Sequence, residues 1–157
     1  MIYIFTGKIR SGKTSKLRGW VEKRTDIGGI LMPVRSGKRY FFNVSSGDHY
    51  SAEADKKEKE IIRIGPFRFS KKGFERANSE ILDSFKKYNI VIIDEIGRIE
   101  LNNKGFAPSL NVIMNDKIKL KKIDLILVVR EDLLKQVTKK FGMSNFKVIT
   151  NIHDINF

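Results

Sequence analysis

The chain has 157 residues, 31 of them lysine or arginine and 18 aspartate or glutamate, which gives a formal net charge of +13. That length predicts one domain, residues 1–157, and a hydrophobic fraction of 41% argues against a disordered chain. The absence of cysteine excludes disulfides, zinc–thiolate sites and cysteine nucleophiles. Since no apolar run approaches the roughly 20 residues that span a bilayer and the N-terminal apolar run is too short for a signal peptide, we expect a soluble, cytoplasmic protein.

The first half of the chain begins with an apolar, β-rich run over residues 1–6. A glycine-containing loop follows, and then a helical pattern that Gly28-Gly29 interrupts. Residues 30–34 and 40–44 are the predicted strands of a hairpin with a three-residue turn, and Pro33 places the first of them at a sheet edge. The pattern is weak from 47 to 60, and 60–64 is predicted as a short strand.

The second half alternates regularly between helices and strands. We expect helices over 71–88, capped by Ser70, over 106–118, with Pro108 in the first turn, and over 131–141, and strands over 90–93, 125–129 and 148–150. The continuous apolar runs of 90–93 and 125–129 are typical of strands buried on both faces. The chain is therefore predicted to form an α/β sheet with right-handed crossovers, into which the hairpin over 30–44 is inserted.

Residues 7–14, Gly-Lys-Ile-Arg-Ser-Gly-Lys-Thr, match the P-loop pattern G-x-x-x-x-G-K-[ST] in full. The glycines let successive backbone N–H groups converge on phosphate oxygens, and the helix that follows adds its positive end. Lys13 is expected to reach the β- and γ-phosphates and Thr14 to ligate Mg²⁺. A chance match in a glycine-rich turn is the alternative, but the strand before and the helix after the motif disfavour it. The predicted phosphate-binding residues are Gly7, Lys8, Ile9, Arg10, Ser11, Gly12, Lys13, Thr14 and Ser15.

Polar residues also follow the two buried strands, at the sheet edge where α/β proteins bind ligands. Asp94 ends the first of these strands, a position from which a carboxylate reaches the Mg²⁺ shell directly or through water. Glu95 comes next and is a candidate base for an attacking water. The two could instead be surface acids at the start of a loop, but the P-loop favours the functional interpretation. Arg130 ends the second strand.

The P-loop and the segment Ile92–Leu101, Ile-Ile-Asp-Glu-Ile-Gly-Arg-Ile-Glu-Leu, together resemble a family of small P-loop nucleoside-triphosphatases that includes the cancer-related nucleoside-triphosphatase. The resemblance covers residues 1 to about 150 and is weakest at 47–66. It implies a RecA-like α/β fold, in which helices flank a mainly parallel sheet, and Mg²⁺-dependent hydrolysis of ATP, GTP and other nucleoside triphosphates to diphosphates. The residues that match the family pattern are Lys13, Thr14, Asp94, Glu95, Gly97 and a basic residue at Arg98.

Two arginines are further catalytic candidates. Arg98 follows Asp94 by four residues and can stabilise transition-state charge, with a salt bridge to Glu95 or Glu100 as the alternative. RecA-like strand order would place the strand that Arg130 ends beside the P-loop strand, which makes Arg130 a sensor or an arginine finger in cis. A solvated arginine is the alternative there.

Basic and aromatic residues in the middle of the chain have two interpretations each. Arg35, Lys38 and Arg39 surround the hairpin turn and would either clamp a base or second substrate or protect a sheet edge from aggregation. Phe67 and Phe69 alternate in an extended stretch and would either stack on a base or pack in the core, which we favour.

Three functions are compatible with the sequence. The first is a nucleoside-triphosphate hydrolase, favoured because a second carboxylate beside the presumed metal ligand suits the activation of water. The second is a nucleoside or nucleotide kinase, for which the basic segment 35–68 would serve as a lid. The third is a nucleic-acid-dependent ATPase, motivated by the charge of +13. No nucleic-acid motif supports it, so we expect weak, non-specific nucleic-acid binding at most and no membrane partner.

Overall fold

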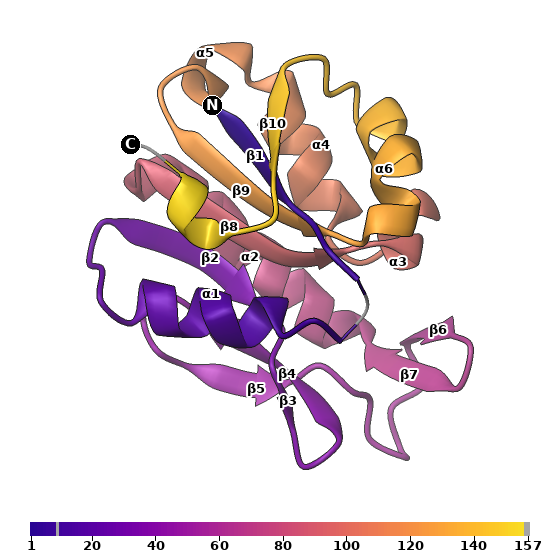
Figure 1. Ribbon diagram of the computed structural model, residues 1–157. Helices are drawn as coiled ribbons and strands as arrows, with labels where there is room; N and C mark the ends of the chain where they lie inside the picture. The colour runs from indigo at the N-terminus through magenta and orange to yellow at the C-terminus, as the bar shows by residue number, and fades with distance from the viewer. Residues whose placement is uncertain (9, 156–157) are drawn as a thin grey trace.

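A computed structural model describes residues 1–8 and 10–155 as a sheet between two helical layers (Figure 1). The strands of the main sheet are β1 (Ile2–Phe5), β2 (Ile27–Leu31), β3 (Val34–Arg35), β4 (Lys38–Asn43), β5 (His49–Ser51), β8 (Ile90–Ile96), β9 (Asp124–Val129) and β10 (Phe146–Ile149). A separate hairpin pairs β6 (Ile61–Ile64) with β7 (Phe67–Ser70). The helices are α1 (Lys13–Val21), α2 (Lys71–Lys87), α3 (Arg98–Leu101), α4 (Ala107–Asn115), α5 (Lys117–Leu120) and α6 (Leu134–Lys140), with 3-10 turns η1 (Glu131–Leu133) and η2 (Ile152–Asp154).

The main sheet has the strand order β10-β1-β9-β8-β2-β4-β3, with β5 paired to β4. The first five strands of this order are parallel to their neighbours, and β4 is antiparallel to β2. The predicted α/β class, a mainly parallel sheet flanked by helices, is therefore confirmed. The order also confirms that β9, which precedes Arg130, lies beside the P-loop strand β1.

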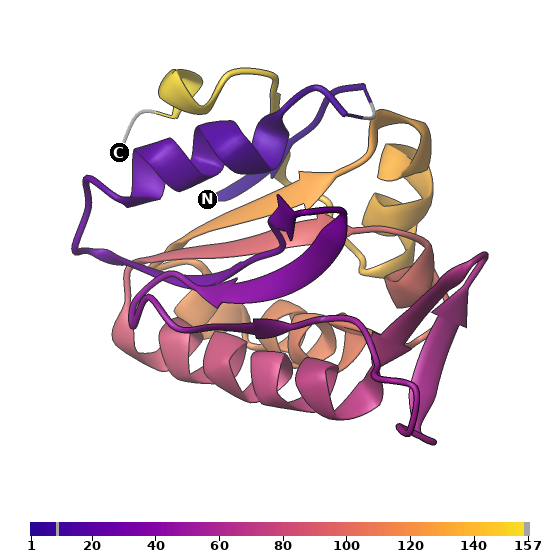
Figure 2. The same ribbon diagram turned by 90° about the horizontal axis from the view of Figure 1, so that it is seen from below.

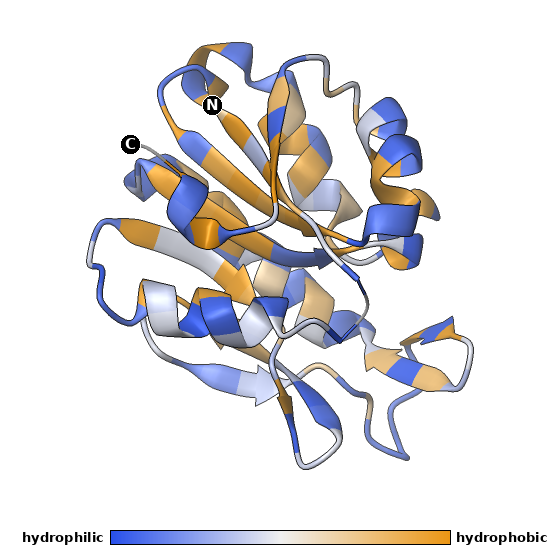
Figure 3. Cartoon of the chain, in the orientation of Figure 1, coloured by the Kyte–Doolittle hydropathy of each residue, from blue (hydrophilic) through white to orange (hydrophobic). Residues whose placement is uncertain are grey.

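Alternation along the central strands builds a core on each face of the sheet. On β8, Ile90 and Ile92 belong to the core beneath α1 and η2, whereas Val91 and Ile93 face α2, α4 and α6. Figure 2 shows α1 and η2 on one side of the sheet and α2 and α4 on the other. In Figure 3 the central strands are largely hydrophobic, and the carboxyl end of β8 turns hydrophilic.

The prediction that Gly28-Gly29 ends a helix was wrong, because both glycines lie inside strand β2. A Cβ on Gly28 would approach Ser84 and Tyr88 to 2.6–2.8 Å, and a Cβ on Gly29 would lie 1.9 Å from the carbonyl oxygen of Ile92. Gly29 has φ 120° and donates its N–H to the Ser84 Oγ at 3.0 Å. The pair thus allows β2 to pack closely against β8 and α2.

The hairpin also differs from the expectation. β2 ends before Pro33 and lies between β8 and β4, so it is an inner strand rather than an edge strand. The turn that joins β3 to β4 consists of two residues, Ser36 and Gly37, whose φ values of 49° and 75° fit a type I′ turn. The inserted hairpin itself is confirmed.

The remaining helices lie where the sequence predicts them, but their lengths differ from the prediction. Ser70 caps α2 by accepting the N–H of Gly73 at 3.0 Å, and Pro108 lies in the first turn of α4, both as predicted. The helix expected over 106–118 is interrupted at Asp116, whose side chain caps the separate helix α5. In the described part of the chain, no helix has both the length and the hydropathy to cross a membrane.

Candidate functional site

The phosphate loop connects β1 to α1 and encloses the ammonium of Lys13. Gly12 occupies the N-cap of α1 with φ 75°, a left-handed conformation that glycine adopts without strain. The Lys13 Nζ donates to the carbonyl oxygens of Gly7 at 3.1 Å and Lys8 at 2.9 Å, and lies 3.3 Å from the Ser11 Oγ. The lysine is therefore folded over the loop, where it is available to an anion.

A cleft of about 610 Å³ opens beside this loop. Its wall includes six of the predicted phosphate-binding residues, namely Arg10, Ser11, Gly12, Lys13, Thr14 and Ser15. Of the other three, Gly7 and Lys8 contribute their carbonyls to Lys13, and Ile9 lies outside the described residues. The basic side chains on the wall are Arg10, Lys13, Arg18, Arg35, Arg39 and Arg130, against the acids Asp94 and Glu95. This excess of positive charge favours a polyanionic ligand.

Strand order brings Asp94 to the same cleft, 80 positions away from Thr14 along the chain. The Thr14 Oγ1 donates to the Asp94 Oδ2 at 2.8 Å, and the backbone N–H of Met32 donates to the same oxygen at 3.1 Å. Asp94 is 1% exposed. Burial, reinforced by the neighbouring Glu95 charge, raises its pKa to about 6, although the bonds from Met32 and Thr14 oppose that shift.

The donor set at this point fits Mg²⁺. A hydroxyl and a carboxylate, which offer the oxygen atoms that Mg²⁺ prefers, meet at the mouth of the phosphate loop. Among the described residues no group of three or more histidine or acidic side chains could cage a metal by itself. The arrangement is thus suited to an ion that completes its shell with phosphate oxygens and water, as Mg²⁺ does beside nucleotides.

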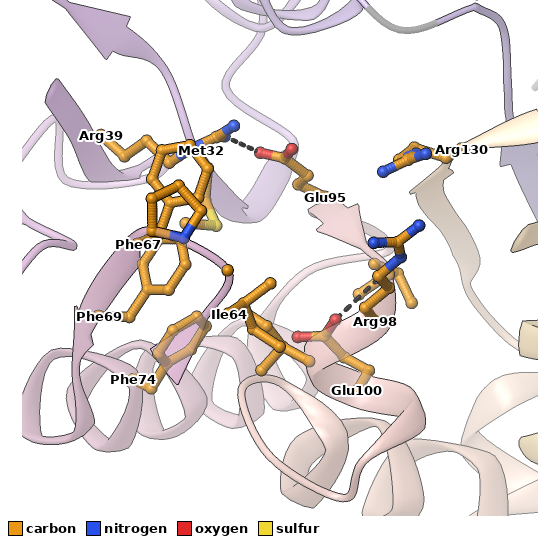
Figure 4. Close-up of a pocket in the computed structure, with 15 residues that line it drawn as sticks. Met32, Arg39, Ile64, Phe67, Phe69, Phe74, Glu95, Arg98, Glu100 and Arg130 are labelled. Carbon is orange, nitrogen blue, oxygen red and sulfur yellow. Dashed lines mark hydrogen bonds and ion pairs between the residues drawn. The ribbon is translucent and has the colours of Figure 1, made fainter. Parts of the chain in front are cut away.

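Glu95 lies in a different environment from its neighbour. It has φ 71°, and the pairing of β8 with β9 is irregular between Ile93 and Ile96, as at a β-bulge. Its half-exposed carboxylate lines both the cleft and an adjoining cavity of about 260 Å³. The carboxylate accepts a hydrogen bond from Arg39 of β4 (Figure 4). Sequence reasoning grouped Arg39 with Arg35 and Lys38 but did not pair it with Glu95.

The two candidate arginines occupy distinct positions. Arg98 is exposed and lines the adjoining cavity, not the cleft, and neither alternative salt bridge is present among the described residues. Glu95 pairs with Arg39 instead, and Glu100 accepts the backbone N–H groups of Gly97 and Phe106 at 2.8 and 3.0 Å. Arg130 lines both cavities, and its guanidinium is held by two bonds to Asp132, so it is not simply solvated.

The two phenylalanines lie in different environments. Phe69 is buried and packs against Phe74, with ring centroids 5.9 Å apart, so core packing is confirmed for it. Phe67 is 43% exposed and lines both cavities. Figure 4 shows these rings on one side of the adjoining cavity and the guanidinium groups of Arg98 and Arg130 on the other.

Comparisons with known proteins agree with this architecture. A family model described as NTPase matches residues 2–156. The chain is 29% identical over 115 residues to the nucleoside-triphosphatase THEP1 of Methanopyrus kandleri, a match that covers 68% of this chain and 63% of that relative, less than two thirds of its length. Its fold is similar to the crystal structure of THEP1 from the hyperthermophile Aquifex aeolicus, with a TM-score of 0.70 and 21% identity over 98% of this chain and 92% of the other.

Proposed function

Because the chain belongs to the NTPase family, we propose that it is a nucleoside-triphosphate phosphohydrolase, which hydrolyses ATP, GTP and other nucleoside triphosphates to diphosphate and phosphate with Mg²⁺ as cofactor. One observation carries the proposal: the hydrogen bond between Thr14 and Asp94 joins the phosphate loop to the acidic end of β8, with Glu95 in the same cleft. The groups that we propose to bind phosphate, to hold the metal and to activate water are thereby all within one cleft.

The phosphate loop would bind the triphosphate through its backbone N–H groups and Lys13. In the free protein the acceptors of Lys13 are two neutral carbonyls and a hydroxyl. Charged phosphate oxygens are stronger acceptors for an ammonium than these neutral groups. We therefore expect Lys13 to exchange them for the β- and γ-phosphates, as the P-loop motif predicts.

Thr14 and Asp94 would hold Mg²⁺, because their side-chain oxygens already meet at the end of the loop. When bound, the ion would neutralise part of the negative charge on the phosphates. Gly12 at the N-cap of α1 leaves the positive end of the helix open toward the same anion.

Glu95 would accept a proton from the attacking water. The water oxygen forms the new bond to the γ-phosphorus as the bond to the β–γ bridging oxygen breaks, and the diphosphate leaves. The water proton passes to the Glu95 carboxylate and from there to phosphate or solvent. A positioned general base of this kind contributes about 10²–10⁴-fold to the rate.

The test is release of inorganic phosphate by the purified protein with Mg²⁺ and no added acceptor, using the eight common NTPs and dNTPs. Wild type should release phosphate from several of them. Lys13→Ala should release none, since loss of the ammonium weakens triphosphate binding and removes the cation from the β- and γ-phosphates, and it should keep the wild-type circular dichroism spectrum. An unchanged rate for Lys13→Ala would contradict the assignment.

One observation supports a second candidate function, a nucleoside or nucleotide kinase. The cavity of about 260 Å³ adjoins the cleft and shares Glu95, Arg39 and Phe67 with it, so an acceptor bound there would face the same terminal phosphate. Its hydroxyl would replace water as the nucleophile. A kinase would release little phosphate in the acceptor-free assay, whereas the hydrolase would release it in full.

A further inference from the structure

Arg39 and Glu95 form an ion pair that crosses the cleft. Arg39 belongs to β4 and Glu95 to β8, two strands separated in the sheet by β2, and the guanidinium Nη1 donates to the Glu95 Oε2. The Arg39 backbone N–H is anchored to the Glu53 carboxylate at 3.1 Å, and its guanidinium lies 5.6 Å from the centre of the Phe67 ring. The main chain at Arg39 is thus fixed, while its long side chain reaches into the cleft.

The pair is accessible to a ligand. The Arg39 and Glu95 side chains are 24% and 39% exposed, and both residues line the cleft that contains Lys13 and Thr14. Two other arginines on this wall, Arg18 and Arg130, pair with Glu22 and Asp132, acids that do not line the cleft. Arg39 differs from them because its partner is the proposed general base.

This contact has a direct chemical consequence for Glu95. The carboxylate oxygen that accepts from Arg39 is occupied by the guanidinium and is less available to a water. The γ-phosphate of a triphosphate offers three non-bridging oxygens and bidentate geometry to a guanidinium, which makes it a strong competitor for Arg39. A nucleoside diphosphate whose β-phosphate is held in the same loop has no phosphate at the γ position.

We propose that Arg39 discriminates triphosphate from diphosphate by changing partners. Without nucleotide, or with a diphosphate, its guanidinium stays on Glu95 and engages one oxygen of the base. When a triphosphate binds, the guanidinium moves to the γ-phosphate, and Glu95 is released to accept the proton of the attacking water. The inference rests on the proposed function and adds a specificity-determining residue to it.

The binding test compares ADP with a non-hydrolysable β,γ-imido analogue of ATP by calorimetry, with Mg²⁺. Arg39→Ala should lower the affinity for the analogue by about 10-fold or more, which is the effect of one lost charge-assisted hydrogen bond. It should change the affinity for ADP by less than about twofold. The matched control is Lys38→Ala, which removes the same charge from the adjacent, exposed position of β4 that lines neither cavity. It should change both affinities by less than about twofold.

A spectroscopic test follows the wild-type protein and needs only the conservative variant Arg39→Lys, for assignment. The guanidinium ¹H–¹⁵N signal of Arg39, assigned by its loss in Arg39→Lys, should be alike in the free and ADP-bound protein and should shift with the analogue. Equal losses of ADP and analogue affinity in Arg39→Ala, no loss in either, or an Arg39 signal indifferent to the γ-phosphate would overturn the inference. If wild type bound no triphosphate at all, the proposed function itself would fail.

Discussion

Asp94 and Glu95 are adjacent in the chain, yet their side chains lie in different environments. Asp94 is buried and accepts from a threonine hydroxyl and a backbone N–H, whereas Glu95 is half-exposed and pairs with an arginine. The bulge in β8 separates the two environments. A buried carboxylate with fixed donors suits a metal ligand, and an accessible one suits proton transfer.

This division predicts different defects for the two matching amide variants. Glu95→Gln should still bind ATP and Mg²⁺ but lose about 10²–10⁴ in single-turnover rate, because the amide cannot accept the proton. Asp94→Asn should instead require a higher Mg²⁺ concentration for half-maximal rate. Equal loss of nucleotide binding in both variants would contradict the division.

At the residue scale, the sequence predicts which side chains belong to the candidate site better than it predicts their hydrogen-bond and ion-pair partners. The P-loop spacing and the acidic end of a buried strand indicated Lys13, Thr14 and Asp94, because motif and strand order together bring them to one edge. The pairing of Arg39 with Glu95 was not predictable in the same way. It depends on how far the β3–β4 hairpin extends past the end of β2 toward β8, and no local sequence pattern predicts that distance.

At the scale of elements, β2 depends on its two glycines. Gly29→Ala should destabilise the protein by about 3 kcal/mol or more, because its Cβ would lie 1.9 Å from the Ile92 carbonyl oxygen and its φ of 120° disfavours any side chain. The matched control is Gly19→Ala in α1, where a Cβ meets nothing within 4 Å. It should be neutral or stabilise the protein by up to about 1 kcal/mol. Urea unfolding measures both, and similar stabilities for the two variants would disprove this role of Gly29.

Helix α3, between β8 and α4, contains a buried carboxylate, Glu100, that predicts a pH dependence. Burial raises its pKa to about 7, even though the N–H groups of Phe106 and Gly97 favour the charged form. The folded state therefore binds more protons than the unfolded chain between about pH 4.5 and 7, so this group's contribution to stability falls as pH rises through that window.

Glu100→Gln removes this titration and leaves that of Asp94 in place. The stability of wild type relative to Glu100→Gln should therefore decrease from pH 5 to pH 7, by at most about 1.4 kcal/mol per pH unit. Urea unfolding at several pH values measures the difference. A difference that is constant over this range would show that Glu100 has an ordinary pKa in the folded protein.

The local sequence pattern was sufficient to predict some strands and helices but not others. The buried strands over 90–93 and 125–129 were predicted because their apolar runs are continuous, and α2 because Ser70 caps a clear helical period. Gly28-Gly29 was misread because glycine usually breaks regular structure, and only the close approach of β8 and α2 explains it there. The short helix α3 has too few residues to show a period.

At the scale of the whole molecule, the excess positive charge is spread out. Part of it lines the cleft, and lysine pairs lie at the start of α2 (Lys71-Lys72), at its end (Lys86-Lys87), after α5 (Lys121-Lys122) and at the end of α6 (Lys139-Lys140). The end of α2 adjoins α5, since the Lys119 Nζ donates to the Lys86 carbonyl oxygen at 3.4 Å. Positive charge distributed over several element ends favours diffuse attraction to a polyanion over one stacking groove for a nucleic-acid strand.

We therefore predict weak, salt-sensitive nucleic-acid binding with dissociation constants of about 10⁻⁴–10⁻⁶ M. Filter binding to single- and double-stranded RNA and DNA across a salt series measures it, alongside ATP hydrolysis with and without each polymer. Submicromolar affinity at physiological salt, or a tenfold rise in hydrolysis, would favour a nucleic-acid-dependent ATPase instead.

Strand order is what unites the site. Placing β9 between β1 and β8 brings residues 10–15, 94–95 and 130 to one edge, and the antiparallel addition of β4 beyond β2 brings Arg39 to the same edge. The parallel part of this order followed from alternating helices and strands and from the family resemblance. The reach of the hairpin over the cleft became visible only in three dimensions.

Hydrolysis of ATP in ¹⁸O-labelled water tests the central claim most directly, namely that this cleft directs water to the γ-phosphate. With wild type and Mg²⁺, the released inorganic phosphate should carry one solvent-derived ¹⁸O and ADP should carry none, since water attacks phosphorus and the β–γ bond breaks on the γ side. Label in ADP, or phosphate withheld until a hydroxyl acceptor is added, would contradict the account.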